Sequence, residues 1–336
     1  MKLTSATLLC LALTVPLVAH TQSTPKKIVA YVTSWSHVIP DPFVMTHINY
    51  AFGGVGRDSI SVYADNIKRM QRIVELKKKN PKLKVLLSVG GWRRGNFTPM
   101  AMDEAKRKAF ARSCRDFCKK YGLDGIDVDW EFPGNNSSKE DSPPDEKKNY
   151  TLLLRDLREA LGNKLLLTMA SSSTPSYYDY ANCIQYLDFV NVMTYDMSTA
   201  PNHHSALYRG GKVGNGWKVQ TDAIEMHINA GIPVSKLVMG LAFYGNSGNG
   251  SQISLQAIKN GIASGKWKDN WDETAKVPYV TDAEGKFAYG YDNERSLTIK
   301  CQYIIQQKLA GAMYWEYAND DNEGTERRTV YKAFYK

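Results

Sequence analysis

The sequence predicts an α/β protein of the (β/α)8 TIM-barrel class. Three observations carry this prediction: short runs rich in β-branched residues alternate with amphipathic helical stretches, eight such runs are present, and no linker or repeat interrupts the alternation. Eight parallel strands with intervening helices close most naturally into a barrel, and a doubly wound open sheet is the alternative.

The elements follow in order along the chain. Strands are expected at 28–35, 45–52, 83–89, 125–131, 164–170, 189–195, 237–243 and 311–315. The clearest helix is 103–121, which begins at Asp103 and stops before Gly122; a second, 145–161, carries leucines on one face before Gly162. The other expected helices are 66–79, 220–230, 296–309 and 326–334.

The fourth expected strand carries acids at every second position, Asp127, Asp129 and Glu131. Because side chains alternate across a strand, the acids face one way and the apolar residues between them face helices on the other side. Successive acids lie about 6–7 Å apart by strand rise, so one or more must hold a proton near neutral pH or accept many hydrogen bonds. A purely structural role rarely offsets that cost, so the pattern indicates a functional site.

A barrel gathers functional residues at the C-terminal ends of its strands. Here the ends of separate strands supply acids, hydroxyls and large aromatic faces. These strand ends are residues 50–52, 88–92, 131, 193–196 and 313–315. Such a mixture suits a sugar, whose C–H faces stack on aromatic rings while its hydroxyls need polar partners.

These motifs resemble glycoside hydrolase family 18, the chitinase family, from about Lys27 to the C-terminus. Asp124, Asp127, Asp129 and Glu131 match its Asp-x-x-Asp-x-Asp-x-Glu signature. Its Ser-x-Gly-Gly, Met-x-Tyr-Asp and closing tryptophan are matched by Ser88, Gly90, Gly91, Met193, Tyr195, Asp196 and Trp315. The resemblance implies hydrolysis of β-1,4 links between N-acetylglucosamine residues in chitin or its oligomers, with no cofactor.

The spacing of the acids constrains the mechanism. Ordinary retaining glycosidases place an acid and a carboxylate nucleophile on opposite sides of the scissile bond, about 5–5.5 Å apart. Asp129 and Glu131, on one face of one strand, approach a sugar from the same side. The nucleophile must come from elsewhere, and the resemblance implies the N-acetyl oxygen of the substrate itself, with net retention.

Four residues are expected to be catalytic. Glu131, outermost on the strand, is expected to protonate the leaving oxygen and later activate water. Asp129 would orient the acetamido group, and Asp127 would share a proton with Asp129. Tyr195 would donate a hydrogen bond to the acetamido oxygen as charge develops.

The expected substrate-binding residues are Tyr31, Phe52, Ser88, Trp92, Met193, Asp196 and Trp315. The resemblance places Tyr31 and Ser88 under Asp127, and Asp196 close to Glu131. It makes Trp315 the floor of the −1 sugar site and stacks Trp92 on the +1 sugar. For Tyr31 and Phe52, core packing is the competing interpretation. Asp124 lies on the other strand face and is expected to be structural.

No metal site is expected. His47, His203 and His204 lack ligand spacing, so we expect structural or surface roles for them. A calcium loop at 127–131 is disfavoured because apolar strand residues occupy the spacer positions.

Residues 1–23 have the pattern of a signal peptide, with Lys2, an apolar run over 8–19 and a cleavage site expected within 19–23. The run is too short to span a bilayer. We therefore expect an exported monomer, periplasmic or secreted, whose residues 24–336 form a single catalytic domain. The net charge is +9, but basic residues are scattered among acids, so nucleic-acid binding is not expected.

Four cysteines follow the leader, with neither zinc-motif spacing nor a disulfide-dense pattern: Cys114, Cys118, Cys183 and Cys301. Buried free thiols are expected. A disulfide between distant pairs remains the alternative in an oxidising compartment.

Two departures from the family pattern bear on the substrate. Ala242 stands where many members have proline, and only about 50 residues separate Gly245 from Arg295, with a hairpin expected at 280–289. We expect at most a small insertion between strand 7 and helix 7, hence a shallow, open cleft. The polar loop 134–144 is expected to border the leaving-group side.

Two alternative functions remain. An endo-β-N-acetylglucosaminidase acting on N-glycans would use the same acids in a wider cleft. A non-catalytic chitin-binding lectin ranks last, because such relatives usually lose the terminal glutamate and Glu131 is present.

Overall fold

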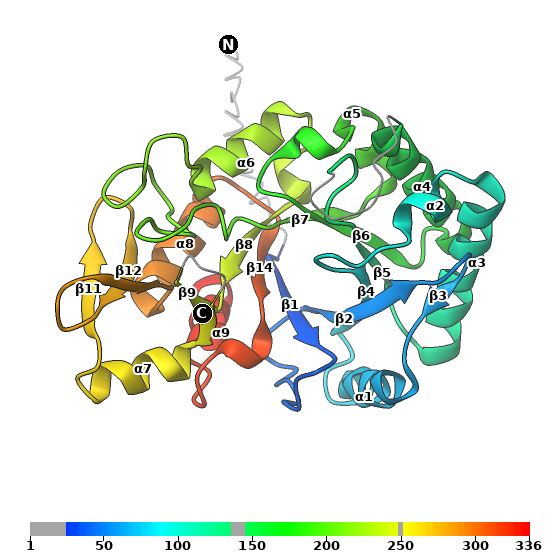
Figure 1. Cartoon of the computed structure of the whole chain (residues 1–336). Helices are drawn as coiled ribbons and strands as arrows, with labels where there is room; N and C mark the ends of the chain where they lie inside the picture. The colour runs from blue at the N-terminus through cyan, green and yellow to red at the C-terminus, as the bar shows by residue number, and fades with distance from the viewer. Residues whose placement is uncertain (1–24, 136–144, 248–250) are drawn as a thin grey trace, which may run out of the picture.

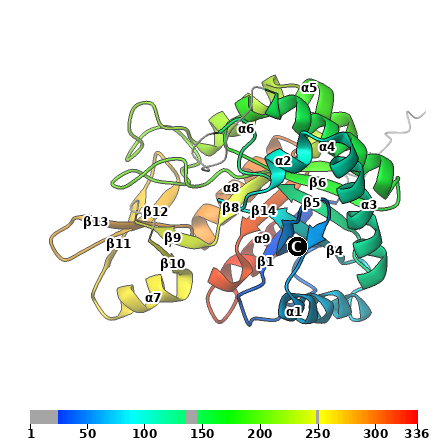
Figure 2. The ribbon, with the colours of Figure 1, turned by 45° about the vertical axis from the view of Figure 1, so that its right-hand side comes forward.

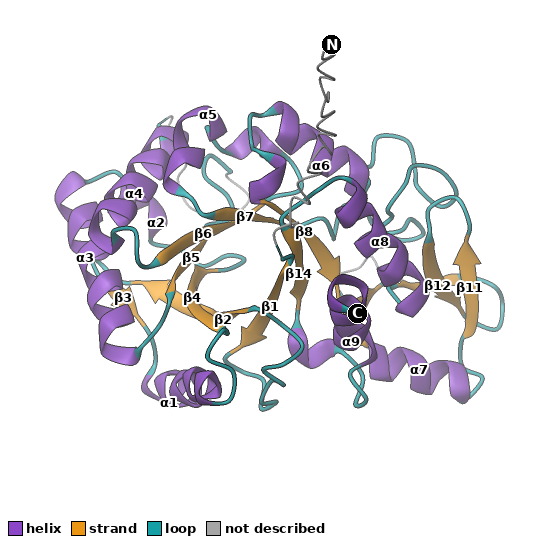
Figure 3. Cartoon of the chain, turned by 180° about the vertical axis from the view of Figure 1, so that it is seen from behind, coloured by secondary structure: helices purple, strands orange, loops and turns teal. Residues whose placement is uncertain are grey.

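The computed structural model describes residues 25–135, 145–247 and 251–336, so the expected signal peptide lies outside the described residues. A closed sheet occupies the centre, and helices lie outside it (Figure 1 and Figure 3). The parallel strands run in the order β1-β14-β8-β7-β6-β5-β4-β2, and pairing of β1 with β2 closes the ring. The (β/α)8 barrel is confirmed, because an open sheet would leave β1 or β2 as an unpaired edge.

Each expected strand has its counterpart. The barrel strands are β1 (Lys27–Thr33), β2 (His47–Val55), β4 (Lys84–Gly90), β5 (Gly125–Asp129), β6 (Leu166–Ser171), β7 (Phe189–Val192), β8 (Leu237–Ala242) and β14 (Gly311–Trp315). A short strand, β3 (Ile60–Ser61), pairs antiparallel with β2. Strands β5 and β7 end earlier than predicted, so Glu131 and Tyr195 lie just beyond them.

The helices around the barrel are α1 (Ala64–Val74), α2 (Phe97–Ala101), α3 (Glu104–Tyr121), α4 (Glu146–Leu161), α5 (Tyr180–Cys183), α6 (Gln220–Asn229), α8 (Glu294–Gln306) and α9 (Thr325–Tyr335). Short 3-10 turns occur at Glu75–Lys78, Pro175–Tyr177, Ile184–Tyr186, Val234–Lys236 and Tyr317–Asn319. All six expected helices are confirmed. The short helices α2 and α5 were missed, because four or five residues cannot display a 3.6-residue period.

The ends of α3 show why this helix was readable from sequence. The Asp103 side chain accepts a hydrogen bond from the Lys106 amide, which satisfies one free N–H of the first turn. At the other end Gly122 has φ +69°, a left-handed conformation that glycine adopts without steric cost.

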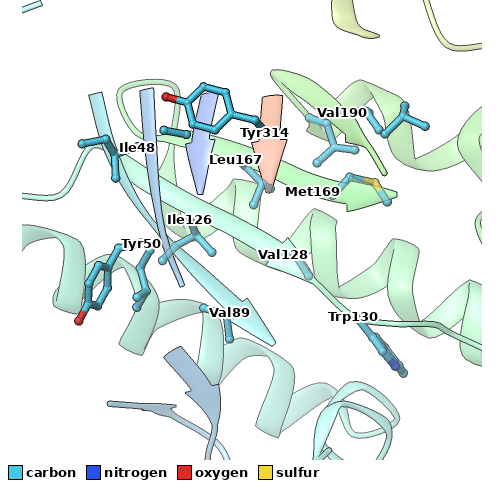
Figure 4. Packing of buried hydrophobic residues seen from close by; sticks show 14 of the residues in the cluster. Ile48, Tyr50, Val89, Ile126, Val128, Trp130, Leu167, Met169, Val190 and Tyr314 are labelled. Carbon is cyan, nitrogen blue, oxygen red and sulfur yellow. The ribbon is translucent and has the colours of Figure 1, made fainter. Parts of the chain in front are cut away.

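The main hydrophobic core fills the space between the barrel and its helices. Ile126, Val128 and Trp130 contribute to it, as the alternation predicted, and lie near Leu167 and Met169 of β6 (Figure 4). Trp130 stacks on Phe97 with ring centroids 5.0 Å apart. All four described cysteines are buried free thiols, as expected: Cys114, Cys118, Cys183 and Cys301.

The segment after β8 is a folded unit that extends to one side of the barrel (Figure 2). It consists of β9 (Tyr244–Asn246), β10 (Gln252–Ser254), α7 (Leu255–Ala263), β11 (Lys268–Asp272), β12 (Val277–Thr281) and β13 (Phe287–Gly290). Its strands form an antiparallel sheet in the order β10-β9-β13-β12-β11. The predicted hairpin is β12–β13, but the remaining strands are too short and too polar for their pattern to have been recognised. We call this unit the insertion sheet.

No helix among the described residues is long and apolar enough to cross a membrane.

Candidate active site

A cleft with a cavity volume of about 650 Å³ opens at the C-terminal ends of the barrel strands. Nine residues predicted from sequence line it: Tyr31, Phe52, Trp92, Asp129, Glu131, Met193, Tyr195, Asp196 and Trp315. Asp127 and Ser88 are fully buried one level deeper in the barrel. The loop at 134–144, expected to border the cleft, lies mostly outside the described residues.

Asp127 is surrounded by hydrogen-bond donors. Its Oδ2 accepts from Tyr31 Oη at 2.9 Å and Ser88 Oγ at 2.8 Å, and its Oδ1 accepts from Thr168 Oγ1 at 2.6 Å and Asn191 Nδ2 at 3.2 Å. Burial raises the pKa of Asp127, and these four hydrogen bonds oppose the rise. Tyr31 and Ser88 lie where the resemblance put them, whereas Thr168 and Asn191 were not anticipated.

Asp129 is also buried, but its carboxyl group has few hydrogen-bond partners. Its Oδ1 has no hydrogen-bond partner among the described residues. Burial, then the charges of Glu131 and Asp127, raise the pKa of Asp129 well above its ordinary value, which favours its protonated form. The four hydrogen bonds to the Asp127 oxygens all come from other donors, and none among the described residues joins Asp127 to Asp129. Sharing of a proton between Asp127 and Asp129 stays a prediction.

Glu131 has the properties of a general acid. Burial raises its pKa to about 7, with a further contribution from the charge of Asp196. Its position beyond β5 brings it into the cleft, where a proton can reach a bound ligand. Asp196 thus lies close enough to Glu131 for its charge to raise the pKa of the glutamate.

Asp196 is held by residues that were not predicted for the site. Asn246 Nδ2 donates to Asp196 Oδ1 at 2.6 Å, and His204 Nδ1 lies 3.3 Å from the same oxygen. Burial acts to raise the pKa of Asp196, but His204, Tyr244 and Asn246 together outweigh it and the pKa is lowered. The expectation of a structural or surface role for His204 is therefore incomplete, because its side chain is buried against a cleft residue. Its contact follows from loop folding and has no local sequence signal.

Aromatic rings form the floor and walls of the cleft. Trp315 stacks on Phe52 with centroids 5.7 Å apart, and Trp35, which was missed, lies 6.2 Å from Phe52 and 6.3 Å from Trp315. Trp35 and Trp92 are 55% and 53% exposed, which is high for tryptophan and typical of a ligand platform. Phe52 packs inside the barrel and also lines the cleft, so core packing is confirmed and its substrate-binding role stays a prediction.

Two glycines let the backbone of β4 approach the site. Gly90 has φ +118°, and a Cβ there would lie 2.1 Å from the Asp129 carbonyl oxygen. Gly91 has φ +97°, and a Cβ there would lie 2.8 Å from Phe52 Cε2. The glycines therefore serve close packing of Asp129 and Phe52 as well as the turn.

Tyr195 has a loosely held hydroxyl. Its nearest described acceptor is Met313 Sδ at 3.9 Å, a weak partner that a ligand oxygen could replace. Burial raises the pKa of Tyr195 well above its ordinary value, so the phenol keeps its proton and remains a donor.

Asp124 lies outside the site, as predicted. It binds Lys77 Nζ at 2.7 Å and the Val85 amide at 2.8 Å, and so ties the 3-10 turn after α1 and the start of β4 to the start of β5. Among the described residues, no group of three His, Cys, Asp or Glu side chains is arranged to hold a metal ion.

A barrel cleft with aromatic walls and a carboxylic acid of raised pKa defines a (β/α)8-barrel glycoside hydrolase. The chain belongs to the glycosyl hydrolases family 18, whose family model matches residues 27–320.

Several relatives can be compared directly. Chitinase A1 of Niallia circulans is 34% identical, over 85% of this chain and 46% of the relative. Chitotriosidase-1 of Mus musculus is 32% identical, over 89% of this chain and 74% of the relative. The solved structure of a family 18 N-acetylglucosaminidase from Paenibacillus barengoltzii is 33% identical with a TM-score of 0.82, covering 92% of this chain and 99% of that one. The chain spans about half the length of Chitinase A1.

Proposed function

We propose that the protein is a retaining, substrate-assisted glycoside hydrolase that cleaves β-1,4-linked N-acetylglucosamine polymers or oligomers, as a chitinase does. The observation that carries the proposal is the placement of its cleft carboxyls. Asp129 and Glu131 come from one strand end, and Asp196 is held beside Glu131, so the described cleft offers no carboxylate across from the acid to serve as nucleophile.

The first step uses Glu131 as general acid. With a pKa of about 7 it is largely protonated at mildly acidic pH, so it can give its proton to the leaving oxygen. The glycosidic C–O bond breaks as the acetamido oxygen of the same sugar attacks the anomeric carbon. This closes an oxazolinium ring on one face, and the leaving oligosaccharide departs with the proton of Glu131.

Asp129 and Tyr195 bind the acetamido group by hydrogen bonds. The Tyr195 hydroxyl donates to the acetamido oxygen, and Asp129 accepts the acetamido N–H as positive charge develops. The buried charge of Asp127, held by its four donors, stabilises the same positive charge from below.

The second step reverses the role of Glu131. Its carboxylate takes a proton from water, the hydroxide oxygen bonds to the anomeric carbon, and the oxazolinium ring opens to the acetamide. Two displacements at one carbon give net retention.

The substrate class is supported by the aromatic platform and by the relatives. Phe52, Trp92 and Trp315, with Trp35 beside them, offer faces on which sugar rings stack. The exposure of Trp35 and Trp92 supports an open cleft, although Gln252 of the insertion sheet also lines it. An exported, monomeric protein of this kind would meet chitin outside the cytoplasm.

A product profile tests the proposal. Purified protein is incubated with N-acetylglucosamine oligomers of increasing length and, in parallel, with a high-mannose glycopeptide, and products are followed by mass spectrometry and by NMR of the fresh anomers. We expect oligomer cleavage with β-anomers formed first. Cleavage of the glycopeptide alone would favour the endo-β-N-acetylglucosaminidase alternative, and binding without cleavage the lectin.

The need for the acetamido group is tested separately. Oligomers of glucosamine, which lack the N-acetyl group, should not be cleaved. Hydrolysis of both series at comparable rates would rule out the substrate-assisted step.

A further inference from the structure

The insertion sheet lies beside Asp196 where β9 and β13 meet. Asn246 of β9 is paired with Gly290 of β13, and the Asn246 side chain donates to Asp196 Oδ1 at 2.6 Å. A Cβ at Gly290 would lie 3.7 Å from His204 Cδ2, so the imidazole packs directly against this strand. The same edge of the sheet therefore supports both partners of Asp196.

His204 has little freedom in this position. His204 is 2% exposed, its ring centroid lies 5.2 Å from that of Tyr244, and its Nδ1 is 3.3 Å from Asp196 Oδ1. Its Nε2 has no hydrogen-bond partner among the described residues. His204 Nδ1 thus faces Asp196 twice: it lies 3.3 Å from the carboxylate oxygen, and the Asp196 amide donates to it at 3.4 Å. The contact with the carboxylate needs the proton on Nδ1.

Asp196 itself occupies an uncommon backbone conformation. Its φ is +52°, in the left-handed region, which orients its side chain differently from that of an ordinary strand residue. A residue in this conformation persists where its surroundings hold it, and the described contacts that do so at its carboxylate come from Asn246 and His204.

We infer that His204 and Asn246 are positioning residues for the hydrolytic reaction: the insertion sheet uses them to hold the Asp196 carboxylate, ionised, beside Glu131. The inference deepens the proposed function and rests on it for the role of Glu131. It assigns a purpose to the insertion sheet other than widening or walling the cleft.

The charge relations around Asp196 give the inference a measurable consequence. The titratable groups facing Asp196 are Glu131, Tyr195, Tyr244 and His204. While Asp196 stays ionised, the proton of the Asp196–Glu131 pair resides on Glu131, where the reaction needs it.

Loss of a donor raises the pKa of Asp196, because hydrogen bonds to its charged form are lost. The proton is then shared between the two carboxyls, and a second proton binds at higher pH than before. The acidic limb of the pH–kcat profile should therefore move to higher pH.

The chain offers a matched control in the preceding residue. His203 is also buried, and its Nε2 lies 3.0 Å from Asp272 Oδ2, but Asp272 belongs to β11 and does not line the cleft. His203→Leu and His204→Leu therefore each remove one buried histidine–aspartate contact made from the same loop. Only the second contact reaches the cleft.

The experiment compares His204→Leu, Asn246→Ala and His203→Leu with the unchanged chain on an N-acetylglucosamine oligomer. For His204→Leu and Asn246→Ala, the ratio of kcat at pH 5 to kcat at pH 7 should fall roughly threefold to tenfold, the size expected for losing one ordinary net hydrogen bond. The ratio should stay unchanged in His203→Leu, whatever its loss of stability. His204→Asn, whose amide can replace Nδ1 as donor, should restore most of the ratio.

An unchanged ratio in both His204→Leu and Asn246→Ala, or an equal change in His203→Leu, would overturn the inference. NMR titration of the Asp side-chain carbonyl carbons provides a readout that needs no turnover, since the Asp196 signal should titrate at higher pH in the two variants. If the unchanged protein cleaves no oligomer, the proposed function fails while this titration still decides the inference. Should His204→Leu not fold, Asn246→Ala carries both measurements.

Discussion

Ser88 and Asp127 are paired in register on β4 and β5, and the Ser88 hydroxyl donates to Asp127 Oδ2 across 2.8 Å. Thr168, the register partner of Asp127 on β6, donates to the other oxygen across 2.6 Å. The register of three neighbouring strands thus builds the polar surroundings of one carboxylate. Asp129, two residues further along the same strand, receives no such support at Oδ1 from the described residues.

The same substitution should therefore have different costs at the two aspartates. Asp127→Asn places an N–H where two donors converge, so it should lower the free energy of unfolding by about 1–3 kcal/mol. Asp129→Asn replaces a carboxyl whose Oδ1 has no hydrogen-bond partner among the described residues, and it should change the free energy of unfolding by less than about 1 kcal/mol. Urea unfolding at pH 7 measures both, and an equal loss in the two variants would contradict the geometry. Each should be severely impaired in turnover.

Glu131→Gln should lower kcat by roughly two orders of magnitude or more, because the amide cannot donate a proton to the leaving oxygen. Oligomer affinity, measured by calorimetry on the variant, should stay within about threefold, since the shape of the cleft is kept. Retained turnover would exclude Glu131 as the general acid.

The alkaline limb of the pH–kcat profile should lie near pH 7. The reaction needs Glu131 protonated, and burial together with Asp196 raises its pKa to about 7, so kcat falls as pH rises through that value, by about tenfold per unit beyond it. The fall in kcat above pH 7 should be smaller for an oligomer with a fluorogenic leaving group of low pKa, because such a group departs with less help from an acid. A limb unaffected by the leaving group would point to a different titrating residue.

Stability should depend on pH through the same carboxyl. The pKa of Glu131 is raised from 4.5 unfolded to about 7 folded, so its contribution is fully present below pH 4.5 and is lost as pH rises to 7. The loss is roughly 1–3 kcal/mol at most, shared with the neighbouring Asp129. Calorimetric Tm values at pH 5 and pH 8 should therefore differ less in Glu131→Gln than in the unchanged chain. An identical Tm difference between pH 5 and pH 8 in both proteins would show that burial does not destabilise the charged form of Glu131.

The exposed tryptophans of the cleft should matter for binding and little for folding. Trp35→Ala and Trp92→Ala should raise KM for long oligomers by roughly fivefold to thirtyfold, as expected for losing about 1–2 kcal/mol of stacking. Trp217→Ala is the control, because Trp217 is 38% exposed but does not line the cleft. Equal effects of all three substitutions on KM would argue against a stacking role.

Much of the site could be predicted from the sequence, because its functional residues lie at or near the ends of strands. Asp127, Asp129 and Tyr31 point into the barrel by simple alternation, and closing the sheet brings them together. Thr168 and Asn191 also occupy inward positions on their strands, but nothing in the local sequence says which acid they bind. Register between strands decides that.

The sequence by itself determined the elements of the barrel, the alternation that buries the acids, and the family to which the chain belongs. These depend on local periodicity and on motifs a few residues long. Only tertiary packing set the different hydrogen-bond surroundings of Asp127 and Asp129 and the position of Trp35 beside the cleft. It also brought Asn246 of the insertion sheet, and His204 packed against that sheet, to Asp196. Burial and hydrogen-bond partners set these properties, and both arise only when segments far apart in the chain are packed together.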